Sequence, residues 1–208
     1  NDFPDWEKKK LGEVYEFKST NSFSRNDLNY DSGKIKNIHY GDIHTKFKTH
    51  FNIENESVPY INKDIDLSKY NDTNFLKVGD LIIADASEDY NDIGKAIEIV
   101  EIKSEKILAG LHTIMGRLNM AEVNIGFMGH YMQSHTTRLN IKKIAQGTKV
   151  LGISSSRLKD ILIELPSQEE QAKITDFLSA LDQTIITLNE DLIKIKQFKK
   201  GLLQKMFV

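Results

Sequence analysis

The most regular hydrophobic pattern in this sequence lies in its C-terminal segment, residues 167–208. Apolar residues recur there at alternating steps of four and three, interrupted at Lys199. Such spacing predicts one long helix with an apolar stripe, which needs a partner helix as in a coiled coil. At 1.5 Å per residue this helix is roughly 60 Å long. The stripe positions expected to pack in a dimer are Ile174, Leu178, Leu181, Ile185, Leu188, Leu192, Ile195 and Leu202.

The start of this helix is marked by Pro166, Ser167 and Glu170. Proline ends the preceding strand because it has no N–H to donate, and a serine followed three residues later by a glutamate is the capping-box pattern of a helix start. The sequence therefore predicts a boundary at this point, with a globular domain over residues 1–166 and a helical segment over residues 167–208.

The globular part contains short apolar runs separated by turn residues, which is typical of short strands. The run Ala96–Ile102 alternates between apolar and acidic residues and predicts a half-buried strand with Glu98 and Glu101 on its solvent side. Two helices are expected, at 122–133 and 136–145. Further strands are expected at 38–43, 58–61, 75–78, 81–84, 107–118 with kinks at Gly110 and Gly116, and 158–165. This mixture predicts an α/β domain of the mixed α+β kind, followed by the long coiled-coil helix.

Composition narrows the class of protein. Hydrophobic residues make up 39% of the chain and charged residues 28%, which is typical of a water-soluble globular protein. The apolar runs are far shorter than the roughly 20 residues that a membrane-spanning helix needs. The chain has no cysteine, which excludes disulfides, thiolate catalysis and cysteine-ligated zinc. We therefore expect a cytoplasmic protein.

The net charge of −2 averages two opposite regions of the sequence. Residues 1–105 contain 14 basic and 21 acidic side chains, whereas residues 106–159 contain eight basic side chains and one acidic side chain. The C-terminal segment has six of each sign. A basic segment of this kind fits a groove that binds phosphates, and a basic surface without any ligand is the alternative interpretation.

One set of residues has the spacing of a magnesium-dependent nuclease. Asp85 lies sixteen residues before Glu101, and Lys103 follows two residues later. In such enzymes a pair of carboxylates holds Mg²⁺ and a lysine helps to activate water. The alternative is an ordinary strand edge that faces solvent, because charged residues are common at such positions.

Other catalytic motifs are missing from the sequence. There is no glycine loop for a methyl-donor cofactor and no Asn-Pro-Pro-aromatic motif to hold a flipped adenine. The run Gly147-Thr148-Lys149 lacks the spacing of a phosphate-binding loop, and the six histidines lack metal-ligand spacing, so no metal site is predicted. These residues predict recognition chemistry without a catalytic set.

Three segments of the chain carry a family signature. The run 161–171, ILIELPSQEEQ, leads into the helix, and the run 201–207, GLLQKMF, ends its apolar pattern. Trp6 with the run 10–13, KLGE, forms the opening, and the run 79–83, GDLII, forms a central strand. Together these segments resemble the specificity subunit of type I restriction-modification systems across the whole chain.

This resemblance implies partners and an assembly. Specificity subunits usually carry two target-recognition domains, each followed by a long helix, and the two helices pack antiparallel to set the distance between half-sites. With one domain and one helix, the chain resembles either a half-length subunit or an excised half, and we expect its helix to pair in a homodimer or with another half. The resemblance implies modification subunits that bind S-adenosylmethionine and methylate adenine, and restriction subunits that use ATP. It places those cofactors and Mg on these partner subunits, so we expect no cofactor and no catalysis in this chain.

The resemblance also implies that the domain reads one half of a bipartite target in double-stranded DNA. Basic side chains would contact phosphates, and polar side chains on loops would read base edges. Each expected contact has the alternative of a solvated loop side chain, and a coiled-coil adaptor that binds protein is a further alternative for the whole chain. The residues expected to bind DNA are Lys46, Lys48, His112, Thr113, Arg117, Gln146, Thr148, Lys149, Ser154, Ser155 and Arg157.

Overall fold

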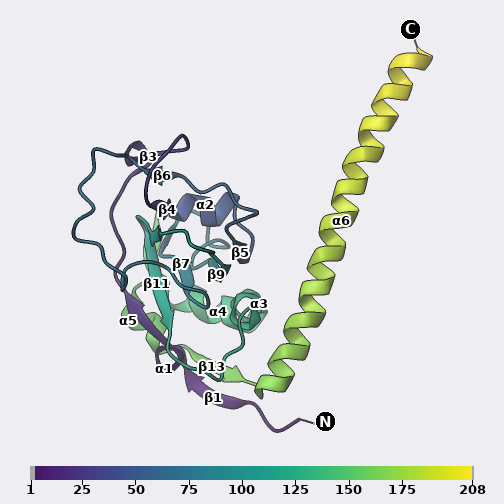
Figure 1. The fold of residues 1–208 in the computed structure, drawn as a ribbon. Coiled ribbons are helices and arrows are strands. Elements are labelled where there is room, and N and C mark those ends of the chain that lie inside the picture. The colour runs from purple at the N-terminus through teal and green to yellow at the C-terminus, as the bar shows by residue number, and fades with distance from the viewer. Residues whose placement is uncertain (1–2, 208) are drawn as a thin grey trace.

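A five-stranded sheet forms the centre of the globular part in the computed structural model, which describes residues 3–207 (Figure 1). Its strands lie in the order β2–β11–β7–β9–β5. Adjacent strands are antiparallel, except that β5 and β9 are parallel. The strands are Tyr15–Lys18 (β2), Thr113–Leu118 (β11), Leu81–Ala84 (β7), Ala96–Glu101 (β9) and His50–Asn52 (β5). With α-helices beside mixed sheets, the mixed α/β class predicted from the sequence is confirmed.

Three smaller sheets surround the central one. The first has the order β10–β4–β6–β3, and the other two are the pairs β1–β13 and β12–β8. The pair β1–β13 joins the N-terminal segment to the strand that directly precedes the long helix. The strands are Glu7–Lys10 (β1), Leu28–Asn29 (β3), Lys36–Ile38 (β4), Tyr60–Ile61 (β6), Ala86–Ser87 (β8), Ile107–Ala109 (β10), Leu151–Gly152 (β12) and Leu162–Leu165 (β13).

The helices lie around these sheets and along one side of the molecule. A 3-10 turn at Arg25–Asp27 precedes β3. The α-helices are Leu11–Val14 (α1), Tyr40–Thr45 (α2), Phe127–Gln133 (α3), His135–Ile144 (α4), Ser155–Lys159 (α5) and Gln168–Met206 (α6). Within the residues that the structure describes, no helix is long and apolar enough to cross a membrane.

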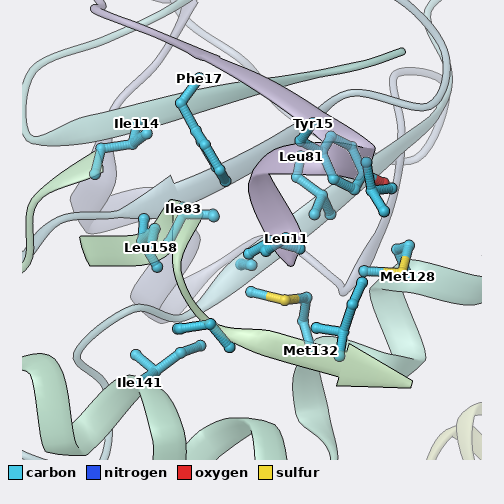
Figure 2. Close-up of a cluster of buried hydrophobic side chains, with 14 of the residues drawn as sticks. Leu11, Tyr15, Phe17, Leu81, Ile83, Ile114, Met128, Met132, Ile141 and Leu158 are labelled. Atoms are coloured by element: carbon cyan, nitrogen blue, oxygen red, sulfur yellow. The ribbon is translucent and has the colours of Figure 1, made fainter. Parts of the chain in front are cut away.

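Strand β7 separates two hydrophobic cores. Successive side chains of a strand point to opposite faces, so Leu81 and Ile83 enter one core while Ile82 and Ala84 enter the other. Figure 2 shows the first core, where Leu81 and Ile83 meet Leu11 of α1 and Met132 of α3. Both faces of this strand are therefore covered, and its four residues are all buried.

Glu98 corrects the prediction of a half-buried strand at Ala96–Ile102. Its side chain is fully buried, because β9 lies inside the sheet and α3 covers the face on which Glu98 lies. Its carboxylate accepts hydrogen bonds from the N–H groups of Gly126, at 2.7 Å, and Gly129. Burial raises the pKa of Glu98 to about 7, against the lowering effect of these hydrogen bonds. The run does form a strand, but Glu98 faces the interior, where its carboxylate accepts hydrogen bonds from N–H groups at the start of α3.

Several predicted elements differ from the structure because short apolar runs do not distinguish strand from helix. In the run 38–43, strand β4 ends at Ile38 and helix α2 begins two residues later. In the run 158–165, the first two residues belong to α5 and the last four form β13. Residues 75–78 lie in a loop that leads into a turn, and residues 122–126 form another loop. The strand predicted at 107–118 is divided into β10 and β11, with a break at Gly110 as expected, whereas Gly116 lies within β11.

Helix α6 spans 39 residues and is anchored through its first turns. Ser167 caps it by accepting a hydrogen bond from the N–H of Glu170, whose carboxylate accepts from the indole of Trp6 at 3.2 Å. Gln171 is buried, donates to the carbonyls of Glu122 and Pro166, and accepts from the N–H of Asn124. The predicted end at Val208 lies outside the described residues. Beyond its start the helix runs past α3 and away from the globular part (Figure 1).

Candidate nucleic-acid interface

Two adjoining cavities form a polar groove at one end of the central sheet. They have volumes of about 300 Å³ and about 330 Å³ and share the segment Lys18–Thr20. The first is lined also by Asn21, Ser22, Lys69, Tyr70, Asn74, Leu108, Ala109 and Met115. The second is lined also by Asp85, Thr113, Ile114, Ile153, Ser154 and Ser155. We call this combined surface the polar groove.

The sheet register places the polar groove. Strand β2 ends at Lys18, opposite Met115, and β7 ends at Ala84, opposite Thr113. The loops that follow β2 and β7 therefore lie at the same end of the sheet. Thr20 fixes one wall, since its hydroxyl lies 3.0 Å from the carbonyl oxygen of Gly110 and 2.8 Å from that of Thr113. A wall held in this way orders its side chains before any ligand binds.

The polar groove carries charged groups of both signs. Lys18 lies 3.2 Å from Glu16, and the ammonium group of Lys69 lies over the ring of Tyr70, 5.2 Å from its centre. Asp85 lies 3.4 Å from His112. Burial raises the pKa of Asp85, while the neighbouring His112 acts in the opposite direction. Donors and acceptors are thus both present, as contacts to phosphates and base edges require.

Some of the predicted DNA-binding residues lie at the polar groove. Ser154 and Ser155 line it. His112 is exposed and contacts Asp85, which also lines it. Thr113 also lines it, but its side chain is buried and its hydroxyl donates to Gly110 at 2.6 Å. The prediction of Thr113 as a DNA contact is therefore corrected, because its side chain is already hydrogen-bonded inside the fold.

Arg117 is a second correction among the predicted DNA contacts. Its side chain is largely buried, and Nε lies 2.7 Å from Oδ1 of Asp80, although the two atoms form an ion contact rather than an aligned hydrogen bond. Its guanidinium also donates to the carbonyl of Phe75 at 2.7 Å. Burial raises the pKa of Asp80, and the nearby positive charge of Arg117 counteracts this effect. The guanidinium of Arg117 is thus already engaged with groups inside the fold.

The other predicted contacts are exposed but do not line the polar groove. Lys46, at the end of α2, is held by Asp42 at 3.0 Å and by the hydroxyl of Tyr30 at 2.9 Å. Arg157 donates to the carbonyl of Ile144 at 3.0 Å. A DNA-binding role stays a prediction for Lys46, Lys48, Gln146, Thr148, Lys149 and Arg157.

The basic segment 106–159 is less uniform in space than in sequence. Besides Arg117, Arg138 is turned inward and donates to the carbonyls of Asn91, Ile93 and Gly94. Burial lowers the pKa of Arg138. Two of the eight cations of this segment are therefore structural, which leaves six of them available for contacts to phosphate.

The nuclease alternative is wrong on geometry. Strands β7 and β9 are antiparallel, with Ile83 opposite Ala96, so Asp85 follows one end of this pair and Glu101 lies at the other. Along the strands the two carboxylates are separated by roughly 20 Å. Lys103 forms an ion pair with Glu54. These three side chains cannot hold one Mg²⁺ ion, whose ligands lie about 2 Å from the metal.

The apolar stripe of α6 is exposed beyond the first turns of the helix. Ile174 is an exception and a correction, since it packs against the first hydrophobic core instead of facing outward. Leu178 is half-buried, whereas the six stripe residues beyond it are exposed by 41% or more. Asp182, which faces α3, and Leu188 of the stripe lie about 120° apart around the helix. The six residues are Leu181, Ile185, Leu188, Leu192, Ile195 and Leu202.

Sequence reasoning missed half of the polar groove. Thr20 lies in a polar run of the sequence, and neither it nor Lys69 and Tyr70 match a recognised motif. The fold brings together residues that lie some fifty positions apart. A polar run that directly follows the last buried residue of a strand was the one available indication, because loops at strand ends often carry function.

The globular part thus carries a polar groove, and α6 carries an apolar stripe that is exposed beyond its first turns. The family described as type I restriction modification DNA specificity domain matches residues 4–197. The chain belongs to this family, as the resemblance predicted.

Known relatives agree in fold and in sequence. The chain is 28% identical over 207 residues to the putative type I restriction enzyme MjaX specificity subunit of Methanocaldococcus jannaschii, covering 98% of this chain and 45% of that protein. It is 27% identical over 205 residues to the type I restriction enzyme MjaVIII specificity subunit of the same organism, covering 96% and 44%. The solved S subunit of the type I restriction-modification system from M. genitalium matches with a TM-score of 0.59 at 18% identity, covering 94% and 43%, which shows the fold. The chain thus spans about half the length of the curated relatives it matches.

Proposed function

We propose that this chain reads one half of a bipartite target in double-stranded DNA and pairs through α6 with a second recognition unit. Family membership supports the DNA-reading role. The observation that carries the pairing is the exposed stripe of α6, where Leu188 is 62% exposed and Ile195 64% exposed. An isolated stripe of this length is unstable in water, so it packs against a second helix.

The polar groove supplies the contacts to DNA in this proposal. Lys18 and Lys69 neutralise phosphates and set the register of the domain, while Ser154, Ser155 and His112 read base edges in the major groove. The loop around Lys149 extends the phosphate contact. Because the total charge of the chain is −2, attraction to DNA comes from this local arrangement rather than from the molecule as a whole.

Two paired helices act as a spacer. Antiparallel packing places the two globular parts at opposite ends of a rod of about 58 Å, calculated from the 39 residues of α6. A second copy of this chain gives two-fold symmetry and a target whose halves are inverted repeats. A different half gives a target with two unlike halves.

The chemistry belongs to partner subunits in this proposal. Modification subunits bind S-adenosylmethionine and methylate adenine, and restriction subunits use ATP and Mg. The names of the relatives support this assignment, since they are specificity subunits of restriction enzymes. This chain contributes recognition and spacing.

Mapping of methylated adenines tests the proposal. The chain is produced together with its cognate modification subunit in cells without other adenine methylation, and the genome is sequenced with base-modification detection. We expect one motif made of two specified parts separated by a gap of fixed length, with inverted-repeat parts for a homodimer. A single uninterrupted motif, or no methylation in the presence of both subunits, contradicts the proposal.

A coiled-coil adaptor that binds protein makes a different prediction. Its affinity for DNA is negligible and does not depend on salt, whereas a DNA reader loses affinity steeply as salt increases. Titration of labelled duplex with the chain and its modification subunit, at two salt concentrations, separates the two functions.

A further inference from the structure

Three potential metal ligands meet between the globular part and α6. His50 begins β5, His130 lies in α3 and Asp182 lies on α6. One nitrogen of each imidazole and one carboxylate oxygen of Asp182 all lie within 4.8 Å of one another. These residues line neither the polar groove nor the apolar stripe, and the proposed function does not use them. Their separation in the sequence explains why spacing alone predicted no metal site.

Direct hydrogen bonds do not account for this cluster. Nδ1 of His130 and Oδ2 of Asp182 are 3.9 Å apart, which is too long for a hydrogen bond. The rings of His50 and His130 are 4.3 Å apart between centres and nearly perpendicular, at 87°. A carboxylate and two imidazoles therefore converge without satisfying one another, and a cation among them would satisfy all three.

Each imidazole also has one ring nitrogen close to a polar group outside the cluster. Nε2 of His50 lies 2.7 Å from the carbonyl oxygen of Gly126. A carbonyl only accepts, so this nitrogen carries the hydrogen and leaves a lone pair on Nδ1. Nε2 of His130 lies 3.4 Å from the hydroxyl of Ser179 on α6. Metal-binding histidines commonly use one ring nitrogen for the ion and the other for a contact of this kind.

Gly129 leaves room for the ring of His50 beside α3, because it has no side chain. A Cβ atom on Gly129 would lie 2.7 Å from the ring of His50, closer than side chains approach one another. The ring of His50 therefore rests directly against the backbone of α3, one residue before His130. This close approach brings the two imidazoles into reach of the same ion.

We propose that His50, His130 and Asp182 bind a divalent transition-metal ion such as Zn²⁺, which fastens α6 to the globular part. Two imidazoles and one carboxylate suit zinc, and a fourth position remains for water. Zinc–nitrogen bonds of about 2.0–2.1 Å place neighbouring ligands about 3.3 Å apart in a tetrahedron, so the cluster must contract slightly. Asp182 allows this movement, since its side chain is 57% exposed on the surface of the helix.

The metal would give α6 a fixed point beyond the first turns, which Gln171 and Ile174 already hold. Gln171 fixes the first turns of the helix, and Asp182 lies eleven residues further, roughly 16 Å along the axis. Two attachment points define the direction of a rod, whereas one allows it to pivot. Any effect of this direction on half-site spacing rests on the proposed function, but binding of the metal does not.

Titration with Zn²⁺ tests the site directly. The full chain, without any histidine tag and freed of metal by a chelator, is titrated with Zn²⁺ in a calorimeter, and Co²⁺ is added separately to record its visible absorption. We expect one equivalent to bind, and Asp182→Asn and His130→Gln to weaken binding by about tenfold or more. The matched controls Asp176→Asn and His135→Gln, which change exposed residues outside the cluster, should bind as the original chain does.

Two results would overturn the site: no binding of Zn²⁺ by the original chain, or equal binding by Asp182→Asn. Because Asp182 is largely exposed and asparagine has the same shape, this variant keeps its fold even if His130→Gln does not. A second measurement uses spin labels on cysteines introduced by Glu88→Cys and Lys194→Cys, since the chain has no cysteine of its own. Zn²⁺ should narrow the distance distribution between the labels, and Asp182→Asn should abolish the narrowing. No DNA is present in either experiment, so their failure leaves the proposed function standing.

Discussion

Arg117 and Asp80 form an ion pair inside the globular part, with 2.7 Å between Nε and Oδ1 and no exposed area on the Asp80 side chain. We predict that Arg117→Ala lowers the free energy of unfolding by about 3 kcal/mol, because it leaves a buried carboxylate without its partner. Urea denaturation measures this change. Lys149→Ala is the matched control, since Lys149 is exposed, and should alter stability by less than about 0.5 kcal/mol. A stable Arg117→Ala variant that fails to bind DNA would show instead that Arg117 contacts the ligand.

The apolar stripe of α6 predicts an assembly that a single charge disrupts. Leu188→Asp should convert the chain from dimer to monomer in light scattering at tens of micromolar, because it places a carboxylate in an apolar seam. Thr187→Asp is the control, as Thr187 is exposed and lies about 100° away around the helix. Circular dichroism should show the globular part folded in both. If the unchanged chain is monomeric at this concentration, pairing between identical helices is ruled out.

The polar groove predicts phosphate contacts that do not depend on sequence. Lys18→Ala and Lys69→Ala should each weaken binding to specific and non-specific duplex alike. Each should also reduce the slope of log K against log salt concentration by about one. Lys8→Ala is the control, because Lys8 lies in β1, away from the polar groove, and is exposed. Equal salt dependence in all three variants would place the DNA elsewhere on the domain.

His39 predicts a loss of stability in mild acid. Burial, together with the charge of Arg25, lowers the pKa of His39 to about 4, and its Nδ1 accepts the N–H of Gly41 at the start of α2. The folded state favours the neutral ring, so the contribution is fully present above pH 6.5 and is lost as the pH falls toward 4. His39→Asn keeps an acceptor but does not titrate.

We therefore expect the loss in stability between pH 7 and pH 5 to be smaller in His39→Asn by about 1 kcal/mol, a value reduced because solvent partly screens the ring. Urea denaturation at the two pH values measures it. An identical pH dependence in both proteins would mean that His39 does not change protonation on unfolding.

Features set by a local pattern were predicted from the sequence, whereas features set by contacts between distant residues were not. Helix α6 was predicted nearly to the residue because its pattern is local, repeated and capped by Ser167. Glu98 was predicted to face solvent and Arg117 to contact DNA, because their burial depends on neighbours distant in the chain. Ile174 fits the stripe by spacing, yet the adjacent core of the globular part covers it first.

Among the candidate sites, the sequence indicated one side of the polar groove and missed the other. Ser154 and Ser155 were predicted as DNA contacts from a polar loop, and they line the polar groove, although their binding to DNA stays a prediction. Thr20 and Lys69 were not, since strand register places them together and no local pattern records that register. The cluster around His130 was missed for the same reason.

The central claim is that two recognition units are held apart by paired α6 helices. Its most direct test is a seven-residue insertion that repeats one heptad of α6 between Leu188 and Ile195, followed by mapping of methylated adenines with the modification subunit. An antiparallel pair lengthened by about 10.5 Å should widen the gap in the motif by about three base pairs while the specified bases stay the same. Methylation with an unchanged gap, or with altered specified bases, would contradict the account.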